Sequence, residues 1–258
     1  MTIPVIGAAV VNSSFWITRL LMSVDYPVDN FVIINNNGRG ELDDELNALT
    51  KMKHKFINKI IVSHLPANLG CSGAWNLIIK CYMLSPYWII ANDDVSFGPG
   101  LLKEFAETVE ADPTVGIVHA HQGEHGIGSW DLFLIRDHII KDYGLFDENL
   151  YPAYCEDSDY FMRLIHHPIN RVMSLNGNYY HGMGDKTQYY EEGMQTQKTD
   201  PTLVDKLSHS NIMNIEYLTK KWGPGWRTCW PSEQPFENQP INTTTYDLDF
   251  VRSKHLGF

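Results

Sequence analysis

The sequence predicts an α/β fold built on a mostly parallel sheet with helices on both faces. In the first 120 of its 258 residues, short runs rich in Val, Ile and aromatic residues alternate with helical patterns. These runs are apolar almost throughout, which is typical of strands that are covered on both faces. Hydrophobic residues make up 43% of the chain and charged residues 20%, so the composition is that of a globular domain with a sizeable core.

The elements follow from these runs in chain order. Five strands are expected, each bounded by Asn, Gly, Pro or Asp: Val5–Val11, Phe31–Asn35, Lys59–Ser63, Tyr87–Ala91 and Val115–Ala120. Four helices are expected between them: Phe15–Val24, Glu41–Lys53, Ser72–Leu84 and Leu101–Glu110. Later a strand at Leu132–Ile135 leads into Arg136–Tyr143, and a further helix is expected at about Glu156–His166. From Lys186 onward we expect polar, irregular chain that forms a lid or a small C-terminal subdomain.

Charge and cysteine usage exclude several classes of protein. The net charge is −11 and the pI is near 5.4, so the chain lacks the broad basic face that nucleic acid requires. The four cysteines show no CxxC spacing, which argues against a zinc knuckle, and isolated thiols fit a reducing compartment. No apolar run approaches 18 residues, so no membrane span is expected. These features predict a cytoplasmic protein.

Polar clusters follow three of the predicted strands. Asn12 ends the first, Asn35-Asn36-Asn37-Gly38 the second and Asn92-Asp93-Asp94 the fourth. Ligands of such sheets bind beyond the carboxyl ends of the strands, so a nucleotide site is expected there. Two carboxylates at a strand end suit Mg²⁺ or Mn²⁺ bound jointly with phosphates. The alternative is a polar turn in which an Asp caps the next segment.

Acidic residues open the predicted helix at Glu156-Asp157-Ser158-Asp159. They either complement the helix dipole, or Glu156 or Asp157 acts as a general base toward a hydroxyl; both interpretations stay open. Asp159 and Arg163 are spaced for a salt bridge on the helix face. His181 is a structural histidine or a third metal ligand. The histidines at 119, 121 and 125 favour acceptor contacts or a solvated loop over a zinc site.

Several other enzyme classes lack their motifs here. No G-x-x-x-x-G-K-[ST] or G-x-G-x-x-G element opens a helix after a strand, so a P-loop and a dinucleotide fingerprint are excluded. No G-x-S-x-G elbow indicates a serine hydrolase.

The clusters, in this order, resemble the inverting family 2 glycosyltransferases of the GT-A fold, particularly their rhamnosyltransferase-like branch. The resemblance runs from about Pro4 to Trp222. Pro4–Asn12 is similar to the first nucleotide-binding strand, and Phe31–Gly38 to the second, where the family often has Asp-Asn instead of Asn36-Asn37. Asn68–Asn76 matches the N-x-G-x-x-x-A-x-N element, the most specific local match. Further similar segments are Asn92-Asp93-Asp94, Gly128–Arg136, Gly144–Glu148, Glu156–Asp159 with Arg163, His181 and Lys221-Trp222-Gly223.

The resemblance implies a role for each matching position. It implies Asp157 as the base, with Glu156 beside it, and Asp94 with His181 as ligands of Mn²⁺ or Mg²⁺. It implies that a nucleotide-diphosphate sugar contacts the following residues: Val10, Asn12, Asn36, Asn37, Asn68, Gly70, Asn76, Asn92, Asp93 and Asp94. Acceptor contacts fall on Trp130, Asp131 and Tyr151. UDP is favoured over dTDP or GDP, a rhamnosyl donor is the family's preference, and the acceptor is a glycan or another hydroxyl compound.

The same resemblance divides the chain into three parts. Residues 1–120 form the nucleotide-sugar-binding half of a GT-A type domain, 121–222 its acceptor-binding and catalytic-base half, and 223–258 a small irregular C-terminal extension. Three alternatives stay open: a retaining GT-A glycosyltransferase, a non-catalytic sugar-binding relative, and a sugar-phosphate nucleotidylyltransferase. The last requires a Gly-rich loop with Arg or Lys after the first strand, where this chain has Asn12-Ser13-Ser14-Phe15. Oligomeric state is not predicted.

Overall fold

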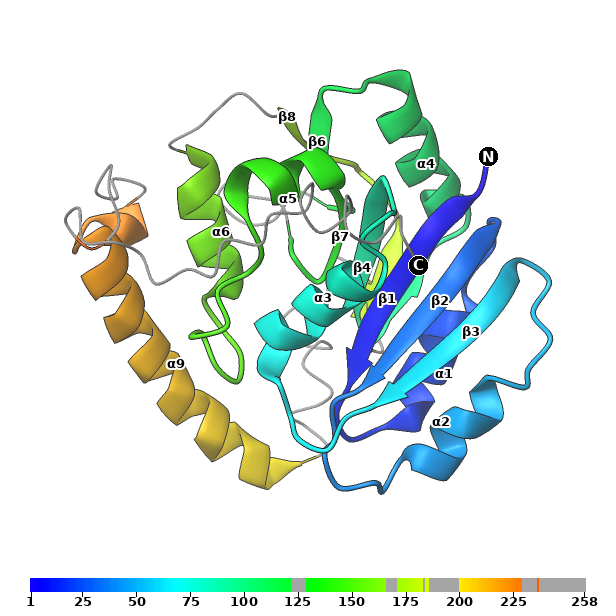
Figure 1. The fold of residues 1–258 in the computed structure, drawn as a ribbon, viewed down its shortest axis with the longest axis horizontal. Helices are drawn as coiled ribbons and strands as arrows, with labels where there is room; N and C mark the ends of the chain where they lie inside the picture. Colours follow the sequence, from blue (N-terminus) through cyan, green and yellow to red (C-terminus); the bar gives the residue numbers. More distant parts are fainter. Residues whose placement is uncertain (122–128, 166–170, 183, 186–199, 229–235, 237–258) are drawn as a thin grey trace, which may run out of the picture.

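A seven-stranded sheet forms the centre of the structure, a computed structural model (Figure 1). Residues 1–121, 129–165, 171–182, 184–185, 200–228 and 236 are described. The strands in spatial order are β3 (Ile57–His64), β2 (Val28–Asn35), β1 (Ile3–Val10), β4 (Tyr87–Asn92), β7 (Leu132–Arg136), β6 (Val115–His119) and β8 (Arg171–Ser174). Only β7 runs antiparallel to its neighbours in this described sheet. The predicted α/β class with a mostly parallel sheet is confirmed.

Helices cover both faces of this sheet because its strands present apolar side chains alternately to each. Ile6 and Ile89 point into one core, packed by α1 (Ser14–Met22), α2 (Asp43–Leu49) and α4 (Leu101–Ala111). Val5 and Ile90 point into the other, packed by α3 (Gly70–Cys81), α5 (Asp137–Tyr143) and α6 (Glu156–Ile165). A fully buried Ile contributes about 1.5–3 kcal/mol, so these two cores fix the positions of the strand ends.

A second, three-stranded antiparallel sheet lies beside the carboxyl end of β4. It pairs β5 (Val95–Phe97) with β9 (Tyr179–His181), and β9 with β10 (Gly184–Asp185). The register places Val95 opposite His181, and the backbone N–H of Gly182 donates to the carbonyl of Asp94 at 2.7 Å. This small sheet therefore brings His181 to the acidic turn after β4.

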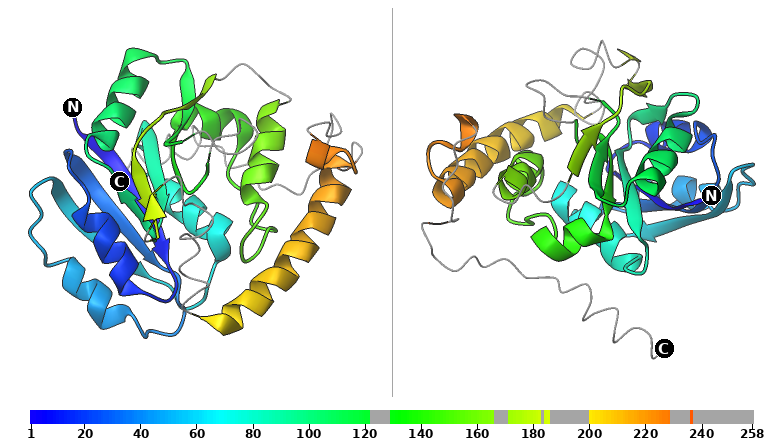
Figure 2. Two further views of the ribbon diagram at one scale, coloured as in Figure 1. Left: turned by 180° about the vertical axis from the view of Figure 1, so that it is seen from behind. Right: turned by 90° about the horizontal axis from the view of Figure 1, so that it is seen from above.

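A long C-terminal helix was not expected from the sequence. The prediction of irregular chain from Lys186 onward is wrong for α9 (Pro201–Trp222), which a short 3₁₀ helix (Trp226–Thr228) follows. Figures 1 and 2 show α9 beside α6 at the edge of the molecule. Leu218 and Trp222 pack there with Leu150 and Met162 in a third core. None of the described helices combines the length and apolarity needed to cross a bilayer.

Candidate functional site

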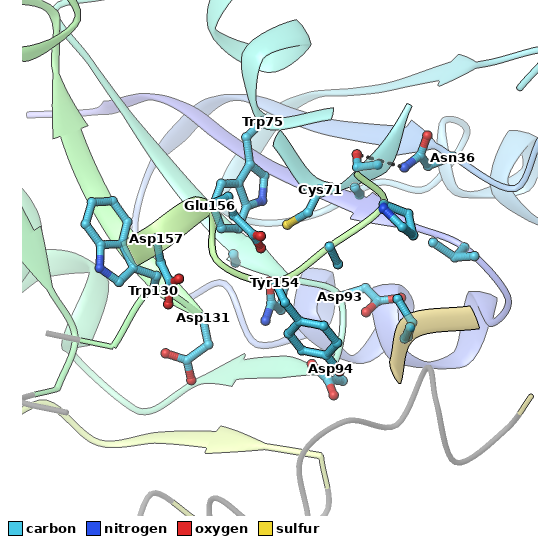
Figure 3. Close-up of a pocket in the computed structure, with 18 of the residues that line it drawn as sticks. Asn36, Cys71, Trp75, Asp93, Asp94, Trp130, Asp131, Tyr154, Glu156 and Asp157 are labelled. Atoms are coloured by element: carbon cyan, nitrogen blue, oxygen red, sulfur yellow. Dashed lines mark hydrogen bonds between the residues drawn. The ribbon is translucent and has the colours of Figure 1, made fainter. Parts of the chain in front are cut away.

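The carboxyl ends of β1 and β4 open into a cavity of about 300 Å³ (Figure 3). Its other walls come from the segment after β2, the start of α3, the loop before α6, β9 and the first turns of α9. The cavity thus lies at the sheet edge where the sequence places a nucleotide site. It collects these predicted residues: Asn36, Asn68, Gly70, Asn92, Asp93, Asp94, Trp130, Asp131, Glu156, Asp157 and His181.

Asp94 and His181 meet inside the cavity although they are far apart in sequence. His181 Nε2 lies 3.1 Å from Asp94 Oδ1, and both side chains are buried. On its other side, His181 Nδ1 lies 3.4 Å from Asp131 Oδ2. Burial alone would lower the pKa of His181, but its hydrogen bond to Asp94 and the charges of Asp94 and Asp131 raise it above the usual value. The ring thus has Asp94 on its Nε2 side and Asp131 on its Nδ1 side.

The cavity is strongly acidic. The described residues that line it include five carboxyl groups and neither lysine nor arginine: Asp93, Asp94, Asp131, Glu156 and Asp157. At an effective dielectric constant near 20, each like-charge pair at 4 Å costs about 4 kcal/mol, so a diphosphate requires a cation to enter. The lining therefore fits a nucleotide diphosphate accompanied by a divalent metal better than the nucleotide alone.

Asp94 and His181 have the chemistry and spacing of two ligands of one such ion. Ligands bound about 2.1 Å from an octahedral ion at right angles lie about 3 Å apart, close to the separation found here. Within the described part of the chain, no set of three or more His, Cys, Asp or Glu side chains forms a complete metal cage. Phosphate oxygens and water would complete the coordination, as is usual for Mg²⁺.

The Asn68–Asn76 element is built around backbone contacts. Asn36 joins the end of β2 to α3: its Oδ1 accepts from the N–H of Leu69 at 2.7 Å and its Nδ2 donates to the carbonyl of Gly70 at 3.2 Å. Gly70 has φ +75°, and a Cβ there would lie 2.8 Å from the carbonyl oxygen of Pro152. The N–H of Cys71 donates to that same oxygen at 2.7 Å. The motif thus locks α3 onto the loop before α6.

That loop carries backbone strain directly before the predicted base. Tyr154 and Cys155 have φ of 77° and 74°, a left-handed conformation that costs non-glycine residues about 1–3 kcal/mol each. The helix α6 then begins with Glu156 and Asp157, and the N–H of Asp159 bonds to the carbonyl of Cys155 at 2.9 Å. Strain of this kind persists only where the surrounding structure holds it, and it is typical of functional sites.

Burial raises the pKa of both neighbouring carboxyls at the start of α6. Burial and the charge of Asp157 raise the pKa of Glu156 to about 8. Burial also raises the pKa of Asp157, against hydrogen bonds from Ser158 that lower it. Glu156 is therefore protonated at neutral pH, with a hydrogen bond from the thiol of Cys71, while Asp157 can accept a proton. Glu156 Oε2 has no hydrogen-bond partner among the described residues.

Asp159 is more than the predicted salt-bridge partner on a helix face. Its bond to Arg163, 2.9 Å from Nη2, is confirmed, but Asp159 is fully buried. It also lies 2.6 Å from Lys221 Nζ and accepts from Trp222 Nε1 at 2.8 Å. This carboxylate therefore joins α6 to α9 and stands outside the cavity lining.

Several residues predicted to contact the nucleotide lie elsewhere. Asn76 is buried and clamps Phe146 from both sides, accepting from its N–H and donating to its carbonyl at 2.9 Å each. Asn37 caps its own turn, donating to the carbonyl of Val11 and accepting from the N–H of Arg39. Val10 is fully buried in the sheet, and neither it nor Asn12 lines the cavity. Contact with the nucleotide is therefore not supported for these four positions.

Of the three predicted acceptor residues, Trp130 and Asp131 line the cavity and Tyr151 does not. Trp130 lines the cavity, held edge-on against His119 and Phe133. Asp131 also lines it, but its carboxylate is occupied by Tyr179, 2.8 Å from Oδ2, besides His181. Tyr151 is about half exposed, and its hydroxyl donates a hydrogen bond to the carbonyl of Asn68 at 3.3 Å.

Of the histidines at 119, 121 and 125, His119 has a different role from the one expected. His119 is buried, 3.0 Å from the carbonyl of Ser129, and burial lowers its pKa to about 4. It is a neutral packing residue under Trp130, so acceptor contact or a solvated loop is wrong for this position. His125 lies outside the described residues.

Several lining residues were missed by the sequence reasoning. They are Cys71, Trp75, Tyr154, Leu203 and Leu207. Cys71 and Trp75 lie inside the Asn68–Asn76 element, so their spacing on the first turns of α3 could have indicated them. Leu203 and Leu207 lie on α9, whose start at Asp200-Pro201 is a helix signal of its own. The described cysteines, Cys71, Cys81 and Cys155, are free thiols.

Comparisons with known proteins bear on this geometry. The sequence model described as glycosyl transferase family 2 matches residues 15–156, more than half of the chain. Residues 1–349 of TarS from S. aureus superpose with a TM-score of 0.51 at 18% identity, over 70% of this chain and 60% of that one. The same protein in complex with UDP-GlcNAc gives a TM-score of 0.53 at 18% identity, over 70% and 58%.

A second solved protein shares the fold. The mannosyltransferase PcManGT from Pyrobaculum calidifontis, in complex with GDP-Man and Mn²⁺, gives a TM-score of 0.54 at 14% identity, over 66% of this chain and 53% of that one. The chain thus spans under two thirds of the length of these structures. No significant match is found among curated protein sequences.

Proposed function

The chain belongs to glycosyl transferase family 2, and we propose that it transfers a sugar from a nucleotide-diphosphate sugar to a hydroxyl acceptor with the help of Mn²⁺ or Mg²⁺. The observation that carries the proposal is the meeting of two acidic groups in one cavity. Asp93 and Asp94 enter from the end of β4, and Glu156 and Asp157 from the start of α6 (Figure 3). The first pair suits a diphosphate with its metal and the second a proton transfer.

The donor end of the cavity is formed by β1, β4 and the start of α3. Asn68 and Gly70 bring backbone groups close to the ligand, and Asn36 keeps them in place through its two bonds. Asp93 and Asn92 are placed to contact the ribose or diphosphate. The likeness to the UDP-GlcNAc complex of TarS and the GDP-Man complex of PcManGT supports a nucleotide-sugar donor.

Asp94 and His181 would hold the metal, with Asp131 and Tyr179 orienting the imidazole from behind. A divalent ion there supplies positive charge that stabilises the leaving diphosphate. The residues contribute a fixed site of low solvent exposure, since Asp94 is 4% exposed and Asp131 3%. Preorganised charge in such surroundings stabilises a developing anion more than it does in water.

Asp157 is the proposed base. The acceptor oxygen forms a bond to the anomeric carbon while the bond from that carbon to the diphosphate oxygen breaks, and the acceptor proton passes to Asp157. Attack from the face opposite the leaving group inverts the anomeric configuration. The raised pKa of Asp157 makes it a better proton acceptor than an exposed aspartate. Trp130 offers an apolar surface for a sugar ring at this end.

Inversion, UDP, a rhamnosyl donor, a glycan acceptor and a cytoplasmic location stay predictions of the sequence, as do the roles of the three chain segments. A nucleotidylyltransferase is disfavoured by the cavity itself, since its described lining offers no lysine or arginine for a triphosphate. A non-catalytic sugar-binding relative has no need of two neighbouring carboxyls, Glu156 and Asp157, in the wall of the cavity.

Asp157→Asn tests the proposal. It removes the base but keeps the shape, so transfer should fall by about 10²–10⁴-fold while nucleotide affinity stays within about twofold. Release of nucleoside diphosphate from matched sugar nucleotides measures transfer, and calorimetry measures affinity. Asp142→Asn on exposed chain is the matched control and should behave as the parent protein. Transfer by Asp157→Asn at the parent rate would show that the base is misassigned.

A further inference from the structure

One face of α9 connects the cavity to the interior of the catalytic half. Leu203 and Leu207, in the first two turns, line the cavity. Asn214 and Lys221 follow on the same face, Trp222 comes next to Lys221, and all three are buried. Spacings of four and seven residues place Leu203, Leu207, Asn214 and Lys221 in one stripe along the helix. A helix with this stripe is a wall of the site and not a loose appendage.

The C-terminal end of this stripe is fixed by buried charges. Lys221 Nζ lies 2.7 Å from Asp147 Oδ2 and 2.6 Å from Asp159 Oδ1. Trp222 Nε1 donates to the same oxygen of Asp159. Tyr217 donates its hydroxyl to Asp147 at 2.8 Å. Because these partners lie on α6 and in the chain before it, α9 cannot slide relative to the start of α6 without breaking buried ion pairs.

Asn214 reaches from this fixed helix to the strained loop. Its Nδ2 donates to two successive carbonyl oxygens, those of Ala153 at 2.9 Å and of Tyr154 at 3.0 Å. The side chain is 3% exposed. Two bonds from one amide group fix the direction of both peptide planes, and the residues with positive φ, Tyr154 and Cys155, lie at these planes. Asp157 follows three residues after Tyr154, at the start of α6.

We propose that Asn214 is a positioning residue, which holds the carbonyls of Ala153 and Tyr154 so that Glu156 and Asp157 enter the cavity in the orientation required for proton transfer. This inference rests on the proposed function. It gives α9 a role in the reaction through Asn214, a residue that contacts neither the substrate nor the metal. A packing role alone would require the shape of Asn214 and not its two N–H donors.

Two substitutions separate these roles. Asn214→Ala removes both donors and the side-chain volume, whereas Asn214→Leu removes the donors and keeps a branched side chain. A positioning role predicts that both lower kcat by at least about tenfold, since displacement of a reacting group by 1 Å can cost about a hundredfold. Nucleoside diphosphate affinity with Mn²⁺ should stay within about twofold in both. Ser208→Ala, on an exposed position of α9, is the matched control.

Thiol labelling supplies a measurement that does not depend on activity. Cys155 is half-buried in the strained loop, and burial raises its pKa to about 12, so it should react slowly with a maleimide. Cys81 is exposed and serves as an internal reference. Release of the loop in Asn214→Ala should raise the labelling rate of Cys155 relative to Cys81 by at least about threefold, in proportion to the opened fraction.

The outcomes are distinct. Loss of kcat in both variants, with nucleotide affinity kept and Cys155 labelled faster, supports the inference. Parent-like kcat in Asn214→Leu, or unchanged labelling of Cys155 in Asn214→Ala, overturns it. If neither variant folds, Asn214→Ser keeps one donor and should show a smaller loss of the same kind; parent-like kcat in it overturns the inference. If the parent protein transfers no sugar, the proposed function fails, and the labelling alone decides whether Asn214 holds the loop.

Discussion

At the scale of single residues, the proposed site depends on two neighbouring carboxyls whose pKa values are both raised by burial. Glu156 and Asp157 share a buried environment that disfavours two negative charges. With its pKa near 8, Glu156 keeps its proton at neutral pH. In the proposed reaction Glu156 then donates a hydrogen bond to a substrate oxygen, and Asp157 accepts the acceptor's proton.

The pH dependence of Glu156→Gln tests this assignment. Because the raised pKa keeps Glu156 neutral below about pH 8, glutamine mimics its working form. Above that pH the parent gains a second buried negative charge and should lose activity, whereas the variant should not. We expect kcat/KM, followed from about pH 6 to about pH 10, to lose its alkaline limb near pH 8 in the variant. Glu107→Gln, an exposed control, should keep the limb.

If the parent protein and Glu156→Gln both lost kcat/KM to the same extent near pH 8, the assignment of the alkaline limb to Glu156 would be contradicted. It would mean that another group titrates there. The acidic limb belongs to Asp157 and should lie above the usual range of an exposed aspartate in both proteins, because burial raises its pKa.

Single-residue roles could be predicted only where chain position determines them. Asp93 and Asp94 follow a buried strand, so the sequence places them at the sheet edge, and the structure confirms that location. Asn76 belongs to the most specific motif, yet it faces Phe146 and not the cavity. A match to the motif indicates that the Asn76 side chain is required, but not what it binds. Asn76 binds the backbone of Phe146, about 70 residues away in the chain, and no local sequence pattern contains that contact.

At the scale of elements, a buried ion network joins α9 to α6 and to the chain before it. Burial alone would raise the pKa of Asp147, but Lys221 and the neighbouring donors lower it to about 2. This carboxylate therefore adds stability above its unfolded pKa near 3.8 that is lost as pH falls toward 2. Lys221 also compensates the charge of Asp159, so its removal leaves two buried carboxylates without their shared cation.

Lys221→Met should therefore destabilise the fold by about 3–5 kcal/mol, the typical cost of removing one partner of a buried pair. Lys220→Met is the matched control, because Lys220 is the exposed neighbour on the same turn, and its effect should stay within about 0.5 kcal/mol. Urea unfolding followed by fluorescence measures both free energies. Equal stability of the two variants would show that the network contributes nothing.

The same network explains why α9 could not be predicted from periodicity. Its inward face carries Asn214, Lys221 and Asn211 among leucines, while Ile212 and Met213 are exposed. This pattern lacks the apolar stripe by which amphipathic helices are recognised. The polar residues are buried because partners on α6 and the preceding loop satisfy them, and those partners are identified only by the fold. Asp200-Pro201 is a local signal for the start of this helix.

At the scale of the whole molecule, sheet topology creates the site. The strands β1 and β4 are adjacent and parallel, so their carboxyl ends lie side by side. The pairing of β5 with β9 places His181 next to that edge of the sheet. Six of the seven strands in the described main sheet were predictable because they are apolar runs bounded by turn residues, whereas the short β8 was not predicted. The small sheet was not, since β5, β9 and β10 are too short to carry a pattern of their own. It is this sheet that brings together Asp94 and His181, 87 residues apart.

A binding titration tests the central claim, that this cavity holds a nucleotide-diphosphate sugar together with a divalent metal. A panel of sugar nucleotides, each with Mn²⁺, should include at least one that raises the melting temperature; at 100 times Kd, binding stabilises by about 2.7 kcal/mol. The shift should disappear with a chelator and in Asp94→Ala. Absence of any shift across the panel, or an equal shift in Asp94→Ala, would contradict the account.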